Sequence, residues 1–113
     1  MPLYLHQWNY KDQQIQRMLA DVESRDRADV VRTATEAFDG KLLHFFYSFG
    51  EYDGVSITSF PDEKSALACM MFIYGQGRIR DLRTAPLFSA EEGIAAIEWV
   101  QLKLGLQPPQ SSG

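Results

Sequence analysis

The sequence has one cysteine and no long apolar run, and each of these absences excludes a class of protein. The single cysteine, Cys69, excludes an internal disulfide and a cysteine-rich zinc site. It lies in an apolar segment with one cation, Lys64, nearby, so we interpret it as a buried small hydrophobic residue rather than a reactive thiol. No apolar run approaches the roughly 20 residues that a membrane-spanning helix needs, and no secretory signal is visible at the start. We therefore expect a cytoplasmic protein with no membrane partner.

An excess of positive charge is also missing. The 113 residues carry a formal net charge of −4, with 11 Lys and Arg against 15 Asp and Glu. Because nucleic-acid-binding proteins use clustered Lys and Arg, we expect no nucleic-acid partner. The length and the apolar fraction of 45% fit one folded domain, which we place at residues 1–104. Residues 105–113 have nothing to bury, and we expect a disordered tail.

Residues 45–57 hold the strongest local pattern in the chain. Aromatic and β-branched residues stand on both sides of a short polar segment, Gly50-Glu51-Tyr52-Asp53-Gly54. This is the composition of a β-hairpin. Glycine at both ends of the segment predicts a positive φ at each end, where any other residue would be strained.

Changes in hydrophobic period divide the rest of the chain into helices and strands. We expect strands at residues 3–8, 41–49, 53–60 and 78–88, two helices between residues 12 and 38 with a break near Ser24, and further helices at 63–74 and from about 89 to 104. The order strand, helix, strand, strand, helix, strand, helix predicts an α+β fold. It is the ferredoxin-like βαββαβ(α) plan, with a four-stranded antiparallel sheet whose helices cover one face.

Helix ends carry their own signals. Gly40 suits a left-handed residue after the second helix, and Asp62 is the expected N-cap of the helix at 63–74. Ser89 and Glu92 have the spacing of a capping box at the start of the last helix. In that helix Ile94, Ile97 and Val100 are spaced as a core stripe, so we expect it to pack on the domain.

Two features predict that the protein associates with itself. Along residues 3–8, leucines alternate with aromatic residues and a histidine, so both faces of the strand are bulky. The helix at 63–74 has almost no polar face, and a helix that is apolar all round is normally buried all round. A domain this small cannot cover so much apolar surface alone, so we expect a homo-oligomer, a dimer or larger.

Five short segments along the chain together form a recognisable pattern. They are Gly50-Glu51-Tyr52-Asp53, Asn9-Tyr10, Gly40-Lys41-Leu42, Pro61-Asp62 and Phe88-Ser89-Ala90-Glu91. With them the chain resembles the GYD-domain family, which is named for a Gly-x-Tyr-Asp element. The resemblance covers residue 3 to about residue 100. It implies a ferredoxin-like domain akin to the dimeric α+β barrels, in which two sheets pack face to face. It implies no reaction, because related barrels include cofactor-free monooxygenases, small isomerases, haem-dependent enzymes and ligand-sensing modules.

One sheet face holds the candidate ligand site. We place Leu3 and Leu5 under the helices, so that the alternate residues of that strand point to the open face. The same alternation, with the third strand lying between the first and second, brings both histidines to that face. The candidate ligand-binding residues are Tyr4, His6, Trp8, His44, Phe46, Ser56 and Thr58. An apolar pocket with a few polar groups, enclosed between the sheets of two copies, predicts binding of a small apolar or aromatic organic ligand.

Catalysis is the alternative, and the sequence leaves it open. His6 or His44 could act as the general base of a cofactor-independent monooxygenase or isomerase, and each could equally be a packed, hydrogen-bonded residue. Tyr52 and Asp53 could form an acid/base pair, or could only shape the turn. No carboxylate accompanies the two histidines and no cofactor motif is present, so we expect no metal and no cofactor. A third possibility is a structural or regulatory assembly unit.

Overall fold

The computed structural model describes residues 1–21 and 26–105. The predicted helix break near Ser24 and all of the predicted tail (105–113) except Gly105 lie outside the described residues.

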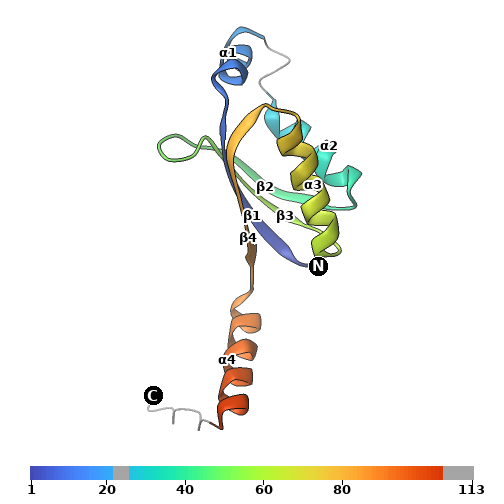
Figure 1. Cartoon of the computed structure of the whole chain (residues 1–113), viewed down its shortest axis with the longest axis vertical. Helices are drawn as coiled ribbons and strands as arrows, with labels where there is room; N and C mark the ends of the chain where they lie inside the picture. Colours follow the sequence, from blue (N-terminus) through green and yellow to red (C-terminus); the bar gives the residue numbers. More distant parts are fainter. Residues whose placement is uncertain (22–25, 106–113) are drawn as a thin grey trace.

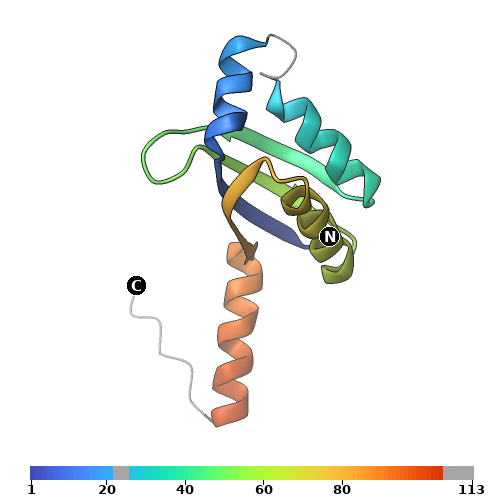
Figure 2. The ribbon, with the colours of Figure 1, turned by 45° about the horizontal axis from the view of Figure 1, so that its top comes forward.

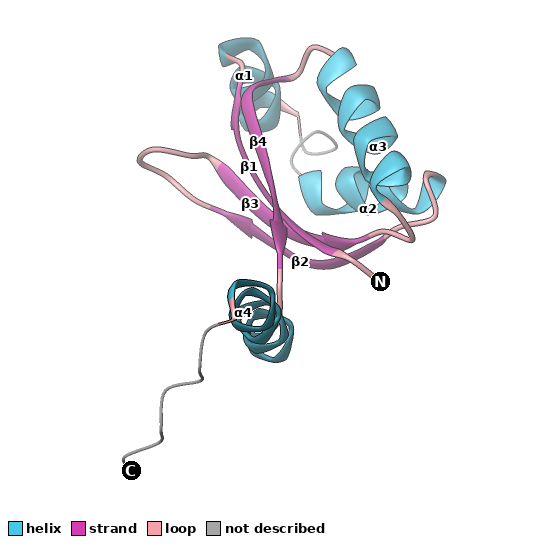
Figure 3. Ribbon diagram, turned by 60° about the horizontal axis from the view of Figure 1, so that its bottom comes forward, coloured by secondary structure: helices cyan, strands magenta, loops and turns pink. Residues whose placement is uncertain are grey.

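The elements follow the predicted order closely. They are β1 (Leu3–Tyr10), α1 (Asp12–Ala20), α2 (Arg27–Ala37), β2 (Lys41–Tyr47), β3 (Gly54–Ser59), α3 (Glu63–Gly75), β4 (Ile79–Leu87) and α4 (Ala90–Leu104). The strands form one antiparallel sheet in the order β2-β3-β1-β4, so that β3 lies between β1 and β2 as expected. Helices α2 and α3 cover one face of the sheet, and α1 lies beyond its end (Figures 1 and 3). The predicted ferredoxin-like α+β fold is confirmed.

The two faces of the sheet are the reverse of our expectation. The buried positions of β1 are the even-numbered ones, Tyr4, His6, Trp8 and Tyr10. These residues face α2 and α3, whereas Leu3 and Leu5 are partly exposed on the open face. The aromatic rings reach across the gap to the helices: Tyr4 packs with Phe60 and with Cys69 of α3. The prediction that Leu3 and Leu5 lie under the helices is therefore wrong; the larger aromatic rings bury more area there.

A bulge in β2 separates the two histidines. The pairing of β2 with β3 shifts between Leu42 and His44, after which His44 lies opposite Ile57 and Phe46 opposite Val55. These four residues share the open face, because directly paired residues of an antiparallel sheet point the same way. Ser56 and Thr58 alternate with them and are buried under the helices. The predicted cluster of both histidines around Ser56 and Thr58 is therefore wrong.

The glycines of the hairpin serve two different purposes. Gly50 has a φ of 108°, as predicted for the turn. Gly54 does not have a positive φ; a Cβ there would lie 2.4 Å from the indole ring of Trp8, so this position needs glycine for space. Gly40 is a similar correction, because Asp39 takes the left-handed conformation (φ 64°) and a Cβ on Gly40 would lie 2.5 Å from the Phe60 ring.

The last helix projects away from the sheet. Its predicted capping box is confirmed, with Ser89 Oγ accepting from the Glu92 N–H and the Glu92 carboxylate accepting from the Ser89 N–H, both at 3.0 Å. The N-cap role of Asp62 in α3 is confirmed as well. However, no residue of α4 is buried, so the expected packing of its apolar stripe on its own domain is wrong. Figure 2 shows α4 extending from the end of β4 without covering either face.

Candidate functional site

A cavity of about 370 Å³ lies between the helix-covered face of the sheet and helices α2 and α3. On the sheet side His6, Trp8, Ser56 and Thr58 line it, and on the helix side Ala34, Thr35, Met70 and Ile73 are among the lining residues. Its volume is within the usual range for small-molecule sites, about 300 to 1,000 Å³.

The cavity exists because small side chains occupy the centre of this layer. Ser56 and Thr58 of β3 and Ala34 and Thr35 of α2 are all buried, at positions where a core would normally carry Leu, Ile or Phe. Unfilled space in a core lowers the free energy of unfolding. Small residues at these facing buried positions therefore do not stabilise the fold. Their arrangement therefore favours a binding role over a packing role.

His6 lies at the centre of the sheet and has both ring nitrogens engaged. Nε2 is hydrogen-bonded to the Thr58 hydroxyl at 2.7 Å and Nδ1 to the Thr84 hydroxyl at 2.9 Å, and the side chain is only 2% exposed. Burial lowers the pKa of His6 to about 4. The imidazole is therefore neutral near pH 7 and poorly suited to take up a proton, which fits a hydrogen-bonded wall residue better than a general base.

Two polar groups at one end of the cavity have no hydrogen-bond partner among the described residues. They are the hydroxyl of Tyr10, at the end of β1, and Nε of Arg27, the first residue of α2. Burial raises the pKa of Tyr10 to about 12, and burial together with the charge of Arg78 lowers the pKa of Arg27. The phenol stays protonated at neutral pH, and the guanidinium stays charged in proteins. This end of the cavity therefore offers hydrogen-bond donors to whatever occupies it.

The predicted ligand residues divide into three groups. His6, Trp8, Ser56 and Thr58 line the cavity. Tyr4 is buried in the neighbouring cluster with Phe60 and Cys69. His44 and Phe46 are exposed on the opposite face, where their rings are stacked with centroids 6.2 Å apart.

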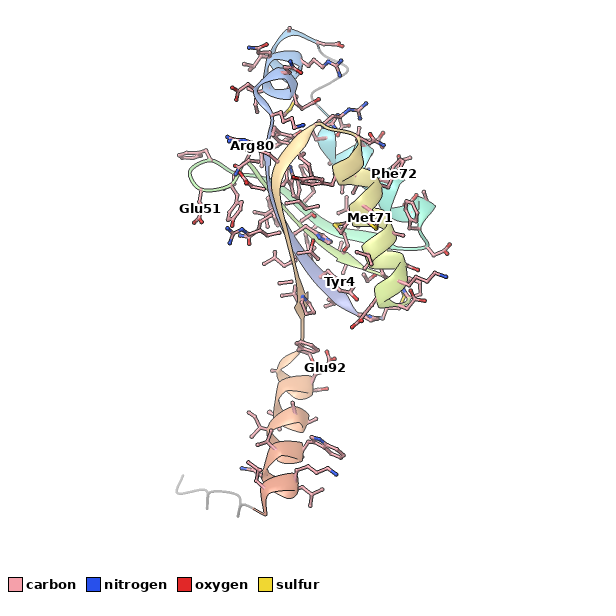
Figure 4. All side chains as sticks on the ribbon, viewed as in Figure 1. Tyr4, Glu51, Met71, Phe72, Arg80 and Glu92 are labelled. Carbon is pink, nitrogen blue, oxygen red and sulfur yellow. The ribbon has the colours of Figure 1, made fainter. Side chains whose placement is uncertain are left out.

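The Gly-x-Tyr-Asp element lies outside the cavity lining. The Asp53 carboxylate accepts from the Tyr10 backbone N–H at 2.9 Å, and the Asp53 N–H donates to the Trp8 carbonyl at 2.9 Å. Asp53 thus fastens the hairpin loop to the end of β1, which places Tyr10 in the cavity wall. This loop extends away from α2 and α3, with Glu51 exposed near its tip (Figure 4). The acid/base role of Tyr52 and Asp53 stays a prediction without a pocket beside it.

Cys69 is fully buried, and burial raises the pKa of its thiol to about 11. The interpretation as a buried hydrophobic residue is confirmed. Among residues 1–21 and 26–105, no three His, Cys, Asp or Glu side chains form a group that could hold a metal ion. Within the same ranges, no helix has both the length and the apolar character needed to cross a bilayer.

Sequence reasoning missed Tyr10 and Arg27 as site residues. Tyr10 is one further step in the alternation of β1, two residues after Trp8, and extending that alternation would have found it. Arg27 gave no signal, because it stands in a run of mixed charges and its burial depends on how α2 meets the sheet.

A family model described as GYD domain matches residues 4–97 of the chain. No curated protein matches it in sequence.

Proposed function

The chain belongs to the GYD domain family, and from that premise we propose that it binds a small, largely apolar organic molecule in the cavity beneath α2 and α3. The observation that carries this proposal is the cavity itself, about 370 Å³, whose wall surface is mostly apolar although about half of its lining residues are polar or charged. The site differs from the sequence-based expectation, which placed the ligand between the sheets of two copies. Catalysis gains no support from His6, since both of its nitrogens are engaged.

A pair of leucine substitutions on one strand tests the proposal. Ser56→Leu fills the cavity, whereas Val55→Leu places the same side chain on the opposite face of β3, where it adds one methylene group. We expect the neutral fluorescent probe N-phenyl-1-naphthylamine to bind the wild-type protein and Val55→Leu but not Ser56→Leu, with melting temperatures confirming that each variant is folded. Equal binding by both variants, or no binding by the wild type, would contradict the proposal.

We also propose that the protein assembles as a homo-oligomer, as the family resemblance implies. Two observations support this. The open face of the sheet carries Leu3, Leu5, Val55 and Ile57 without a covering layer. The 15-residue helix α4 buries nothing, although an isolated helix of that length is marginal in water. A second copy that covers both surfaces would remove this cost.

The outer side of α3 adds to this apolar surface. Leu67, Met71 and Tyr74 are more than half exposed, and Figure 4 shows Met71 and Phe72 on this helix. Light scattering at micromolar concentration tests the assembly: a mass of two or more chains is expected, and the mass of a single chain would contradict the proposal.

A further inference from the structure

The unpartnered polar groups at one end of the cavity specify the ligand more closely. Tyr10 is 3% exposed and Arg27 is 9% exposed, and both line the cavity. Neither the Tyr10 hydroxyl nor Arg27 Nε makes a hydrogen bond of good geometry within the described residues, although the two side chains lie close enough to influence each other's pKa. A buried polar group without a partner costs about 1 to 3 kcal/mol, and more when it is charged. A ligand that supplies the missing acceptor would remove both penalties at once.

The local charge is positive. Arg78 also lines this end of the cavity and lies close enough to Arg27 to lower its pKa. The one acidic residue in the lining, Asp29, is exposed, and its carboxylate is 3.5 Å from Arg32. No described carboxylate forms a salt bridge with Arg27 or Arg78. Among the described residues, this end of the cavity therefore favours an anionic group over a cationic one.

The arrangement of donors selects the kind of anion. A guanidinium edge and one phenol hydroxyl supply a small, directed set of hydrogens, which matches the two oxygens of a carboxylate. Apolar side chains such as Met70, Ile73 and Leu82 line the rest of the cavity, together with the small hydroxyl side chains of β3 and α2. It extends along β1 to His6, four residues from Tyr10 and so about 13 Å away at ~3.3 Å per residue. Such a site accommodates a flat or branched apolar body with an acidic group at one end.

We propose that the ligand of this cavity is an apolar or aromatic carboxylic acid, whose carboxylate binds the Arg27 guanidinium and the Tyr10 hydroxyl. This rests on the proposed function, because it assigns the polarity of the molecule that the cavity holds. In the assignment Trp8, Met70 and Ile73 contact the apolar body, while Arg78 adds long-range attraction for the acid.

Two probes of the same shape test the assignment by calorimetry at pH 7: 2-naphthoic acid, which is ionised, and 2-naphthamide, which is neutral. We expect the wild-type protein to bind the acid about 10- to 100-fold more tightly than the amide, the range of a charge-assisted hydrogen bond. Arg27→Met should abolish this preference while the affinity for the amide is retained. Tyr10→Phe, which removes only the hydroxyl, should weaken acid binding about two- to tenfold. Arg32→Met, one turn and a half further along α2 and outside the cavity lining, should change neither affinity.

The possible failures are distinguishable. If the wild-type protein binds both probes equally, or if the preference for the acid survives in both Arg27→Met and Tyr10→Phe, the carboxylate assignment is wrong and the cavity remains a site for neutral molecules. If neither naphthalene probe nor N-phenyl-1-naphthylamine binds, the proposed function fails and the assignment fails with it. If Arg27→Met does not fold, the comparison of acid with amide in the wild type and in Tyr10→Phe still decides.

Discussion

The two faces of the sheet use opposite kinds of side chain for opposite purposes. The face beneath α2 and α3 carries aromatic rings and small polar residues, including His6, Ser56 and Thr58, and encloses a cavity. The open face carries Leu3, Leu5, Val55 and Ile57, which are the residues of an ordinary hydrophobic core, and the chain leaves it uncovered. The helix-covered face thus has side chains suited to enclosing a ligand. The exposed face has side chains suited to packing against another layer of protein.

The difference suggests how the fold divides stability from binding. Aliphatic side chains stabilise a fold most where they pack without voids. On the open face they can pack in this way only against another layer of protein. Polar residues beneath the helices are held by hydrogen bonds across strands, as His6 is by Thr58 and Thr84. A site kept open in this way needs its stability from elsewhere, and an assembly through the opposite face would provide it.

We expect the largest effect from a substitution that disrupts association through the open face. Ile57→Lys places a charge in the middle of the proposed interface, where an unpaired buried charge costs about 3 kcal/mol or more per chain. We expect sedimentation velocity to report a single chain for this variant. Leu19→Lys on α1, where the leucine is 84% exposed, is the matched control and should leave the assembly intact. Assembly unchanged by Ile57→Lys would show that copies meet through some other surface.

The pH dependence of stability probes the covered face. Because the pKa of His6 falls from 6.5 to about 4 on folding, the unfolded chain binds a proton between these values that the folded chain does not. Stability from this group is complete above pH 6.5 and is lost as the pH falls toward 4, by at most about 1.4 kcal/mol per pH unit and about 3 kcal/mol in total. Urea unfolding from pH 7 to 4.5 should show this slope in the wild type and in His44→Gln.

His6→Gln should lack that part of the slope, although it is less stable at pH 7. Parallel stability curves for the wild type and His6→Gln would mean that His6 does not titrate as a buried neutral imidazole.

A smaller effect is expected at the contact between the hairpin and the covered face. Gly54→Ala places a methyl group against the Trp8 ring, and we expect a loss of about 1 to 3 kcal/mol in the free energy of unfolding, as for other overpacked cores. Gly93→Ala in α4, where a Cβ meets nothing within 4 Å, should be neutral or slightly stabilising. Equal stability of the two variants, measured by urea unfolding, would contradict the tight approach of Gly54 to Trp8.

Elements and their order were predictable because their signals are local. The alternation in β1, the hairpin around Gly50, and the caps at Asp62 and Ser89 each follow from a few neighbouring residues. The family resemblance agreed with these signals and with the match over residues 4–97.

Which face of the sheet the helices cover was not predictable from the sequence. Both sets of side chains in β1 are bulky, and the alternation of side chains is the same whichever set is buried. The bulge between Leu42 and His44 leaves no mark in the composition, yet it decides which face His44 occupies. The placement of Tyr10 and Arg27 at the same end of the cavity depends on how β1 meets α2, and α1 separates these two elements in the chain. Sequence reasoning therefore found four lining residues and placed them on the wrong face.

Sedimentation equilibrium with N-phenyl-1-naphthylamine, recorded at the absorption of the probe, tests most directly whether the two faces act separately. We predict that the probe sediments with a particle of at least two wild-type chains. Ser56→Leu should lose the probe and keep the mass, and Ile57→Lys should keep the probe and fall to one chain. A wild-type protein that sediments as one chain, or variants that lose probe and mass together, would contradict the account.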